Sequence, residues 1–234
     1  MNFDSPLFHA SLVERDALVL ADVCLEGGEV VTAFCSNVSR MKTLSVPGTE
    51  VYVSFNRKEG RRLLYTWETA AVNGTLVGVN DGRRFPLIIE GIRNGVLREL
   101  AGYKDIQRVL PSKNGSCADM FLIPEDSRFP VCCAAADTVY LKRDADLTYP
   151  DGIYIANRKI VNEFKSALDS GERAVLILLA QRIDALGVRA DWNADPQYLA
   201  ELKDLCDRGL EILCYGCSVS ERGIWIAARL PFMF

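Results

Sequence analysis

The sequence predicts an α/β protein in which a small β-barrel precedes a domain of helices on a mixed sheet. Short runs of β-branched and aromatic residues, separated by turns, fill the first part of the chain. After Pro86 the apolar residues fall at helical spacing, and from there helices and buried strands alternate. We therefore place the barrel at residues 1–82 and the second domain at residues 83–234.

Five short strands are expected in the first domain, at residues 18–25, 30–35, 51–55, 63–72 and 75–79. A Glu-Gly-Gly-Glu turn at 26–29 separates the first two. Asn73-Gly74 joins the last two and is a strong hairpin signal, because both residues tolerate a positive φ. About five strands close an OB-like barrel and remove the exposed edges, so this fold is the natural candidate.

The second domain is predicted to begin with a helix after Pro86, since proline is favoured in a first helical turn. A second helix at 160–168 ends near Gly171, and Asp195-Pro196 caps a third that ends near Gly209. Strands are expected at residues 106–110, 118–123, 131–141, 173–180 and 210–217, with an edge strand at 224–230. This order predicts an α/β domain with a mixed sheet.

Composition excludes several classes of function. The net charge of −4 argues against strong non-specific binding of nucleic acid, and the single histidine, His9, argues against His-based zinc or nucleophile chemistry. Cys214 and Cys217 are interpreted as buried strand residues, because no second pair stands at zinc-ribbon spacing. We expect reduced cysteines and a cytoplasmic protein with no membrane segment.

A set of short motifs then leads to a family. The motifs are Leu20-Ala21-Asp22-Val23, Cys35-Ser36-Asn37-Val38-Ser39-Arg40-Met41, Val46-Pro47-Gly48, Tyr65-Thr66-Trp67-Glu68, Val77-Gly78-Val79-Asn80, Glu99-Leu100-Ala101-Gly102-Tyr103, Ser116-Cys117-Ala118-Asp119, Tyr149-Pro150-Asp151-Gly152 and Gly209-Leu210-Glu211-Ile212-Leu213-Cys214-Tyr215. In order and spacing they resemble the sugar fermentation stimulation protein A (SfsA) family along the whole chain. The resemblance implies an OB-like DNA-binding domain, followed by a PD-(D/E)xK nuclease-like domain, and a link to the regulation of sugar use.

The resemblance also indicates where a nuclease site would lie. A nuclease of this fold uses two carboxylates to hold Mg²⁺ and a lysine to orient water. Asp119 matches the first acid of the family's Ser-Arg-x-Asp-Phe pattern, although Cys117 and Met120 replace its arginine and its aromatic residue. Glu90 matches the acidic residue of the family's first helix.

The second acid and the lysine have both been replaced. They form a Glu-x-Lys pattern in the family, and alignment through Leu141 places Ala135 at the glutamate and Asp137 at the lysine. Side chains two apart share one face of a strand, so both changes affect the same face. After the family's Phe-Pro-Asp-Ala motif, which begins here at Tyr149, apolar residues 154–156 replace several basic and polar ones.

The first hypothesis is therefore a catalytically impaired, DNA-binding nuclease homologue that needs no cofactor. Its candidate contacts to double-stranded DNA are Arg40, Lys42, Arg83, Arg84, Arg158 and Lys159. An alternative is a weak endonuclease in which Asp119, Asp137 and Glu90 hold Mg²⁺ or Mn²⁺. A third reading is a protein-interaction or small-ligand module without DNA binding. Whether the chain forms a homodimer stays open.

Overall fold

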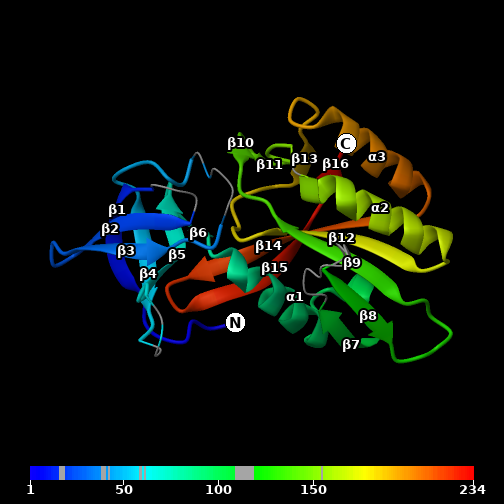
Figure 1. Cartoon of the computed structure of the whole chain (residues 1–234), viewed down its shortest axis with the longest axis horizontal. Coiled ribbons are helices and arrows are strands. Elements are labelled where there is room, and N and C mark those ends of the chain that lie inside the picture. Colours follow the sequence, from blue (N-terminus) through cyan, green and yellow to red (C-terminus); the bar gives the residue numbers. More distant parts are fainter. Residues whose placement is uncertain are drawn as a thin grey trace. The chain divides into compact units, whose positions relative to one another are not determined.

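The computed structural model describes residues 1–15, 19–37, 41, 43–57, 60, 62–108, 119–153 and 155–234, without the side chains of residues 155 and 156. It divides into two compact units (Figure 1). The first unit holds Met1–Leu87, Gln181–Asp184 and Cys217–Ala227, and the second holds Ile88–Ala180, Ala185–Gly216 and Ala228–Phe234. The carboxyl-terminal part of the chain therefore contributes to both units.

The first unit is built on a closed five-stranded barrel, as predicted. Its strands are β1 (Phe8–Glu14), β2 (Leu20–Leu25), β3 (Val30–Phe34), β4 (Glu50–Phe55) and β5 (Tyr65–Val72). They follow the order β3-β2-β1-β4-β5, and a parallel pairing of β3 with β5 closes the ring. Closure leaves the barrel strands no free edge. The barrel is filled by buried side chains that include Trp67, Leu12 and Val53.

The set of barrel strands differs from the predicted one. Strand β1 was not expected, and the predicted fifth strand is β6 (Thr75–Gly78), which pairs with β5 and lies outside the ring. In β1 only Ala10 and Leu12 are buried, and because alanine is small, the alternation of apolar and polar residues that predicts a strand is weak there. The predicted hairpin is confirmed, because Asn73 and Gly74 have φ of 52° and 75° between the paired residues Val72 and Thr75.

The mixed sheet predicted for the second domain is present and has six strands. It comprises β7 (Tyr103–Arg108), β8 (Met120–Pro124), β9 (Cys132–Thr138), β12 (Arg173–Ala180), β14 (Glu211–Ser220) and β15 (Gly223–Leu230), in the order β15-β14-β12-β9-β8-β7. Strands β9, β12 and β14 run parallel, whereas β7, β8 and β9 pair antiparallel. The edge position predicted for the last strand is confirmed.

Three α-helices accompany this sheet: α1 (Arg84–Arg93), α2 (Ile155–Asp169) and α3 (Pro196–Asp207). Helix α2 packs on β9 and β12, and α3 packs against α2 (Figure 1). The predicted cap of α3 is confirmed, because the Asp195 carboxylate accepts from the Tyr198 N–H at 3.1 Å. Gly171 and Gly209, which follow α2 and α3, have φ of 75° and 114°, as residues after a helix end often do. Short 3₁₀ turns lie at Asp81–Arg83 (η1) and Arg98–Leu100 (η2).

A second, small sheet was not predicted. It contains β10 (Lys142–Arg143), β11 (Asp146–Tyr149), β13 (Val188–Ala190) and β16 (Phe232–Met233), in that order. The strand expected at 131–141 accordingly ends earlier, at Thr138. Strands of two to four residues carry no measurable period, and their partners lie far away in the sequence.

Two expectations from composition concern cysteines and membranes. Seven described cysteines are free, and Cys214 and Cys217 are buried in β14, as predicted. Among the described residues, no helix combines the length and the apolar character that crossing a membrane would require.

Candidate functional site

Of the residues expected to carry nuclease chemistry, Ala135 and Asp137 lie on β9 and Asp119 lies just before β8, which is its neighbouring strand. Asp119 donates its N–H to the Ala134 carbonyl at 3.0 Å, and its Oδ2 accepts from the Ala136 N–H at 2.7 Å. The carboxylate of Asp119 is therefore anchored to the backbone of β9. The structure thus brings the Asp119 motif and the Ala135–Asp137 motif together on neighbouring strands.

Ala135 belongs to the hydrophobic core of the second unit. Its side chain is 5% exposed and shares a cluster with Tyr149, Ile160 and Phe164, which lie on β11 and α2. A methyl group at this position can neither bind a metal ion nor hold a water molecule. The position that the resemblance assigns to the family's glutamate is therefore part of the packing beneath α2.

Asp137 faces the same side of β9 and lies beside two buried phenols. Its Oδ1 accepts from the Thr138 N–H at 2.8 Å, and Tyr149 forms a hydrogen bond with it. The hydroxyl groups of Tyr149 and Tyr198 are 3.0 Å apart. Burial raises the pKa of Tyr149 well above its usual value, and the neighbouring Tyr198 and the charge of Asp137 raise it further. Burial also raises the pKa of Tyr198, so both phenols stay neutral and the Tyr149 hydroxyl can donate to the Asp137 carboxylate.

The carboxylates do not assemble into a metal site. Glu90 is half-buried on α1, and Asp119 and Asp137 have the backbone and phenol partners described above. Within the described part of the chain, no group of three or more His, Cys, Asp or Glu side chains could hold a metal ion. The donor set does not fit the Mg²⁺ or Mn²⁺ that the fold family implies.

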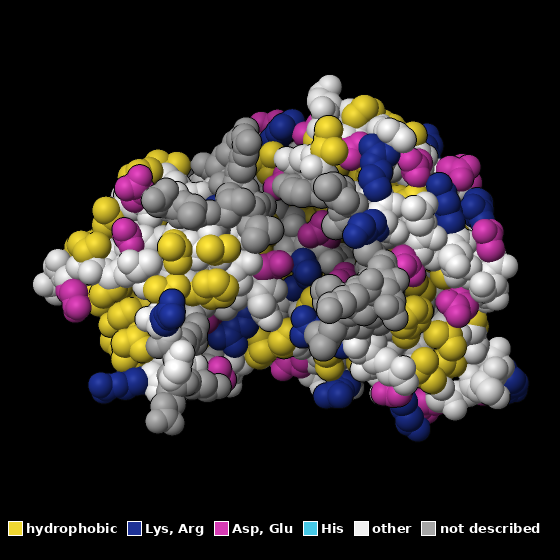
Figure 2. Space-filling view, viewed as in Figure 1, with side chains coloured by type: hydrophobic (Ala, Val, Ile, Leu, Met, Phe, Trp, Pro, Cys, Tyr) yellow, Lys and Arg dark blue, Asp and Glu magenta, His cyan; other side chains and the backbone are white. Residues whose placement is uncertain are grey.

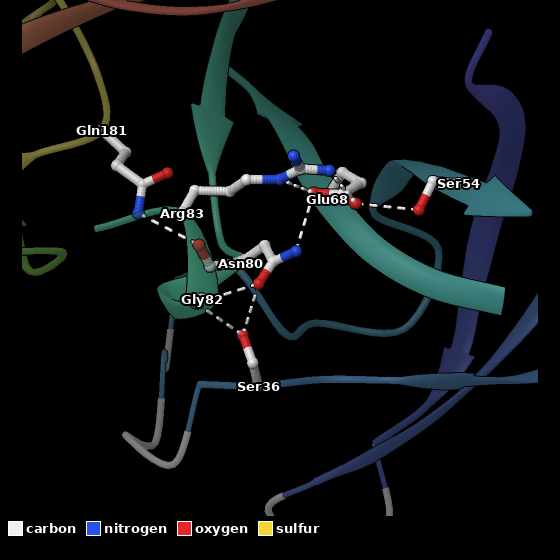
Figure 3. Close-up of polar contacts among 7 residues, drawn as sticks. All are labelled: Ser36, Ser54, Glu68, Asn80, Gly82, Arg83 and Gln181. Atoms are coloured by element: carbon white, nitrogen blue, oxygen red, sulfur yellow. Dashed lines mark hydrogen bonds and ion pairs between the residues drawn. The ribbon is translucent and has the colours of Figure 1, made fainter. Parts of the chain in front are cut away.

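A second polar cluster lies in the first unit around Glu68 (Figure 3). This side chain is buried on β5, and its two oxygens accept from Arg83 at 2.9 and 3.1 Å. They also accept from Ser54 Oγ and Asn80 Nδ2, each at 2.8 Å. Asn80 in turn accepts from Ser36 Oγ at 2.7 Å. Every oxygen of the buried carboxylate therefore has two donors, which offsets the cost of removing it from water.

This cluster unites three of the motifs that indicated the family, and its roles were not predicted. Ser36, Glu68 and Asn80 come from separate motifs of the barrel half. A signal was present in the sequence, because Glu68 is a lone charge in the otherwise uncharged strand Tyr65–Val72. Such a residue needs a cationic partner when it is buried, but sequence alone does not identify Arg83 as that partner.

The candidate DNA contacts have different environments. Arg83 forms the ion pair with Glu68, and its guanidinium lies 5.3 Å from the ring centroid of Phe3. Arg84 pairs with Asp81 at 3.1 Å. These internal ion pairs give the two arginines a structural role in the first unit.

On α2, Arg158 bridges to α3 through Asp195 at 3.1 Å and Glu201 at 3.2 Å. Lys159 is exposed. The remaining two candidates, Arg40 and Lys42, lie outside the described residues. On the face shown in Figure 2, basic and acidic side chains are interspersed.

Comparison with known proteins covers both halves of the chain. Residues 19–79 match the family model described as the SfsA N-terminal OB domain, and residues 84–223 match the sugar fermentation stimulation protein RE domain. A sugar fermentation stimulation protein homolog of Rhodospirillum rubrum is 34% identical over 100% of this chain and 99% of its own length. A homolog of Nitrosococcus oceani is 35% identical over 99% of both chains. The solved structure of Pyrococcus furiosus SfsA in complex with Ca²⁺ has a TM-score of 0.86 at 20% identity, covering 99% and 97% of the chains, and so shares the fold.

Proposed function

Because the chain belongs to the sugar fermentation stimulation protein (SfsA) family, we propose that it binds double-stranded DNA without cutting it. The environment of Ala135 and Asp137 carries the second half of this proposal. A core methyl group and a phenol-bound carboxylate stand where cleavage would need a metal ligand and a cation. In keeping with the name of its relatives, we place its role in the regulation of sugar use.

Lys159 is the DNA contact that the structure favours among the described candidates. It is exposed on α2, whereas Arg83, Arg84 and Arg158 already form ion pairs within the protein. An exposed lysine that meets a phosphate releases a counterion, so its removal should lower the salt dependence of binding. Replacing Lys159 therefore tests DNA contact with little risk to the fold.

The first experiment is fluorescence anisotropy of a labelled duplex at about 50 and 200 mM salt. We expect Lys159→Gln to reduce the slope of log K against log salt by about one, as loss of one phosphate contact does. The matched control is Lys203→Gln, an exposed lysine on α3. Absence of duplex binding by folded wild-type protein at low salt would refute DNA binding and favour an interaction module, for which the net charge of −4 and the mixed surface charge argue.

The second experiment adds Mn²⁺ to a supercoiled plasmid. A relative has been solved with Ca²⁺, so a residual metal-dependent endonuclease is the competing proposal, with Asp119 as its first carboxylate. The proposed function predicts no nicking over hours by the wild-type chain. Nicking by wild-type protein that disappears in Asp119→Ala would establish the endonuclease instead.

A further inference from the structure

Three aromatic rings gather at one end of the barrel, around the start of β1. Phe8 begins β1, Phe55 ends β4 and Tyr65 begins β5. The ring centroid of Phe8 lies 6.4 Å from that of Phe55 and 6.3 Å from that of Tyr65, and the latter two are 5.2 Å apart. We name Phe8, Phe55 and Tyr65 the aromatic cluster.

The aromatic cluster is not part of the buried core. One step further into the barrel, Val53 and Trp67 are paired and completely buried, whereas Phe8 is 48% exposed. A phenylalanine ring half in water forgoes much of the free energy that its burial would supply. Packing of the barrel end accounts for Phe55 and Tyr65, but it leaves about half of the Phe8 side chain exposed.

Basic side chains flank the aromatic cluster. Arg57 follows Phe55 by two residues and Arg62 precedes Tyr65 by three, so their Cα atoms lie within about 7 and 10 Å of the respective aromatic Cα atoms. Both arginines are exposed, and neither forms an ion pair with any residue that the structure describes. They lie in the β4–β5 connection, which in OB folds is one of the loops that contact oligonucleotides.

We propose that the aromatic cluster, with Arg57 and Arg62, binds single-stranded DNA by stacking an unpaired base on Phe8. An exposed ring offers a surface to any base, and adjacent guanidinium groups attract the phosphates on either side of it. The two exposed arginines favour a polyanion over an apolar peptide. The inference deepens the proposed DNA binding and rests on it, but duplex bases are stacked on one another and cannot use this surface.

The test compares two labelled oligomers of about 20 nucleotides, longer than the roughly 4–16 that one OB barrel covers. One is oligothymidylate, and the other is an abasic strand with the same phosphates. We expect Phe8→Ala to weaken oligothymidylate binding about tenfold with no effect on the abasic strand, and Phe8→Trp to retain binding. The control Val13→Ala, on the same strand and 43% exposed, should bind as wild type does.

The charges are tested separately with Arg57→Gln/Arg62→Gln. Loss of two phosphate contacts should reduce the single-strand salt slope by about 1.4, whereas Arg93→Gln/Arg222→Gln, which removes two exposed arginines elsewhere, should leave it unchanged. Equal binding of oligothymidylate by wild type and Phe8→Ala, both with unchanged Tm, would overturn the inference.

The duplex measurement keeps the two proposals apart. Duplex binding without oligothymidylate binding would overturn the stacking surface and leave the proposed function standing. Oligothymidylate binding that needs Phe8, without any duplex binding, would support the stacking surface and overturn duplex binding as the function.

Discussion

Replacing Arg83 by methionine should destabilise the first unit far more than the same change at Arg84. The Glu68 side chain is 2% exposed and takes two of its four hydrogen bonds from Arg83. Removing one partner of a buried ion pair costs about 3–5 kcal/mol. Because Ser54 and Asn80 remain as donors, we expect a cost near the lower limit, about 3 kcal/mol.

Thermal unfolding measures this cost directly. For a chain of this length, about 1 kcal/mol shifts Tm by about 2–4 °C, so Arg83→Met should lower Tm by about 6–12 °C. Arg84→Met is the matched control, because the side chain of its partner Asp81 is 27% exposed and water can solvate the carboxylate left behind. Its cost should stay within about 1 kcal/mol.

A double-mutant cycle decides whether the loss comes from the orphaned carboxylate. Glu68→Gln combined with Arg83→Met removes both charges, so the double variant should be more stable than the sum of the two single losses predicts, by about 0.5–3 kcal/mol. Equal stability of Arg83→Met and Arg84→Met would refute the structural role of this ion pair. Reduced DNA binding by an Arg83→Met protein of unchanged Tm would identify Arg83 as a DNA contact instead.

Three further changes test other parts of the molecule. Gly78→Ala should cost about 1–3 kcal/mol by thermal unfolding, because a Cβ would lie 2.5 Å from Gln181 Oε1 in a buried contact. Above about pH 10 the phenol of Tyr149 ionises in the unfolded chain but stays neutral in the folded protein, because its folded-state pKa is raised, so stability falls as the pH rises. Tyr149→Phe removes this phenol, and its free energy of unfolding should therefore fall less steeply above about pH 10 than that of the wild type. Burial alone would raise the pKa of Glu99, but hydrogen bonds from Tyr215 and Arg229 leave it below its usual value. A lowered folded-state pKa stabilises the protein above the unfolded pKa, and this contribution is lost as the pH falls. Unfolding measured against pH should therefore show the wild type more stable than Glu99→Gln at pH 7, with the difference disappearing in acid.

The sequence was sufficient where local physics decides the structure. Asn73-Gly74 has the backbone that a two-residue hairpin requires, and Arg173–Ala180 is a buried parallel strand with the predicted bounds. The signals fail where pairing is long-range. Strand β1 carries only two buried residues, and the short strand Val188–Ala190 exists because it pairs with partners about 40 residues away in either direction.

The candidate site divides in the same way. Alignment placed Ala135 and Asp137 on one face of a strand next to Asp119, and the structure has them there. What alignment could not give was the environment of Asp137, because Tyr149 and Tyr198 come from β11 and α3. Nor could it show that Arg83 is paired with a buried carboxylate, because the burial of Glu68 depends on the closed barrel.

The phenol beside Asp137 affects how metal-dependent cutting could be introduced at the position that the resemblance assigns to the family's lysine. Tyr149 stands where the family's Phe-Pro-Asp-Ala motif begins with phenylalanine, and its hydroxyl serves the carboxylate of Asp137 and the hydroxyl of Tyr198. In Ala135→Glu/Asp137→Lys the ammonium group can donate to the Tyr149 hydroxyl, which can in turn donate to the Tyr198 oxygen 3.0 Å away. Tyr149→Phe would remove this link and leave the ammonium group and the Tyr198 hydroxyl each short of a partner, at a cost of about 1–3 kcal/mol. We therefore expect Ala135→Glu/Asp137→Lys/Tyr149→Phe to be less stable than the double variant in thermal unfolding and to nick plasmid DNA no faster with Mn²⁺. A triple variant as stable as the double variant would show that the Tyr149 hydroxyl does not hold the introduced lysine.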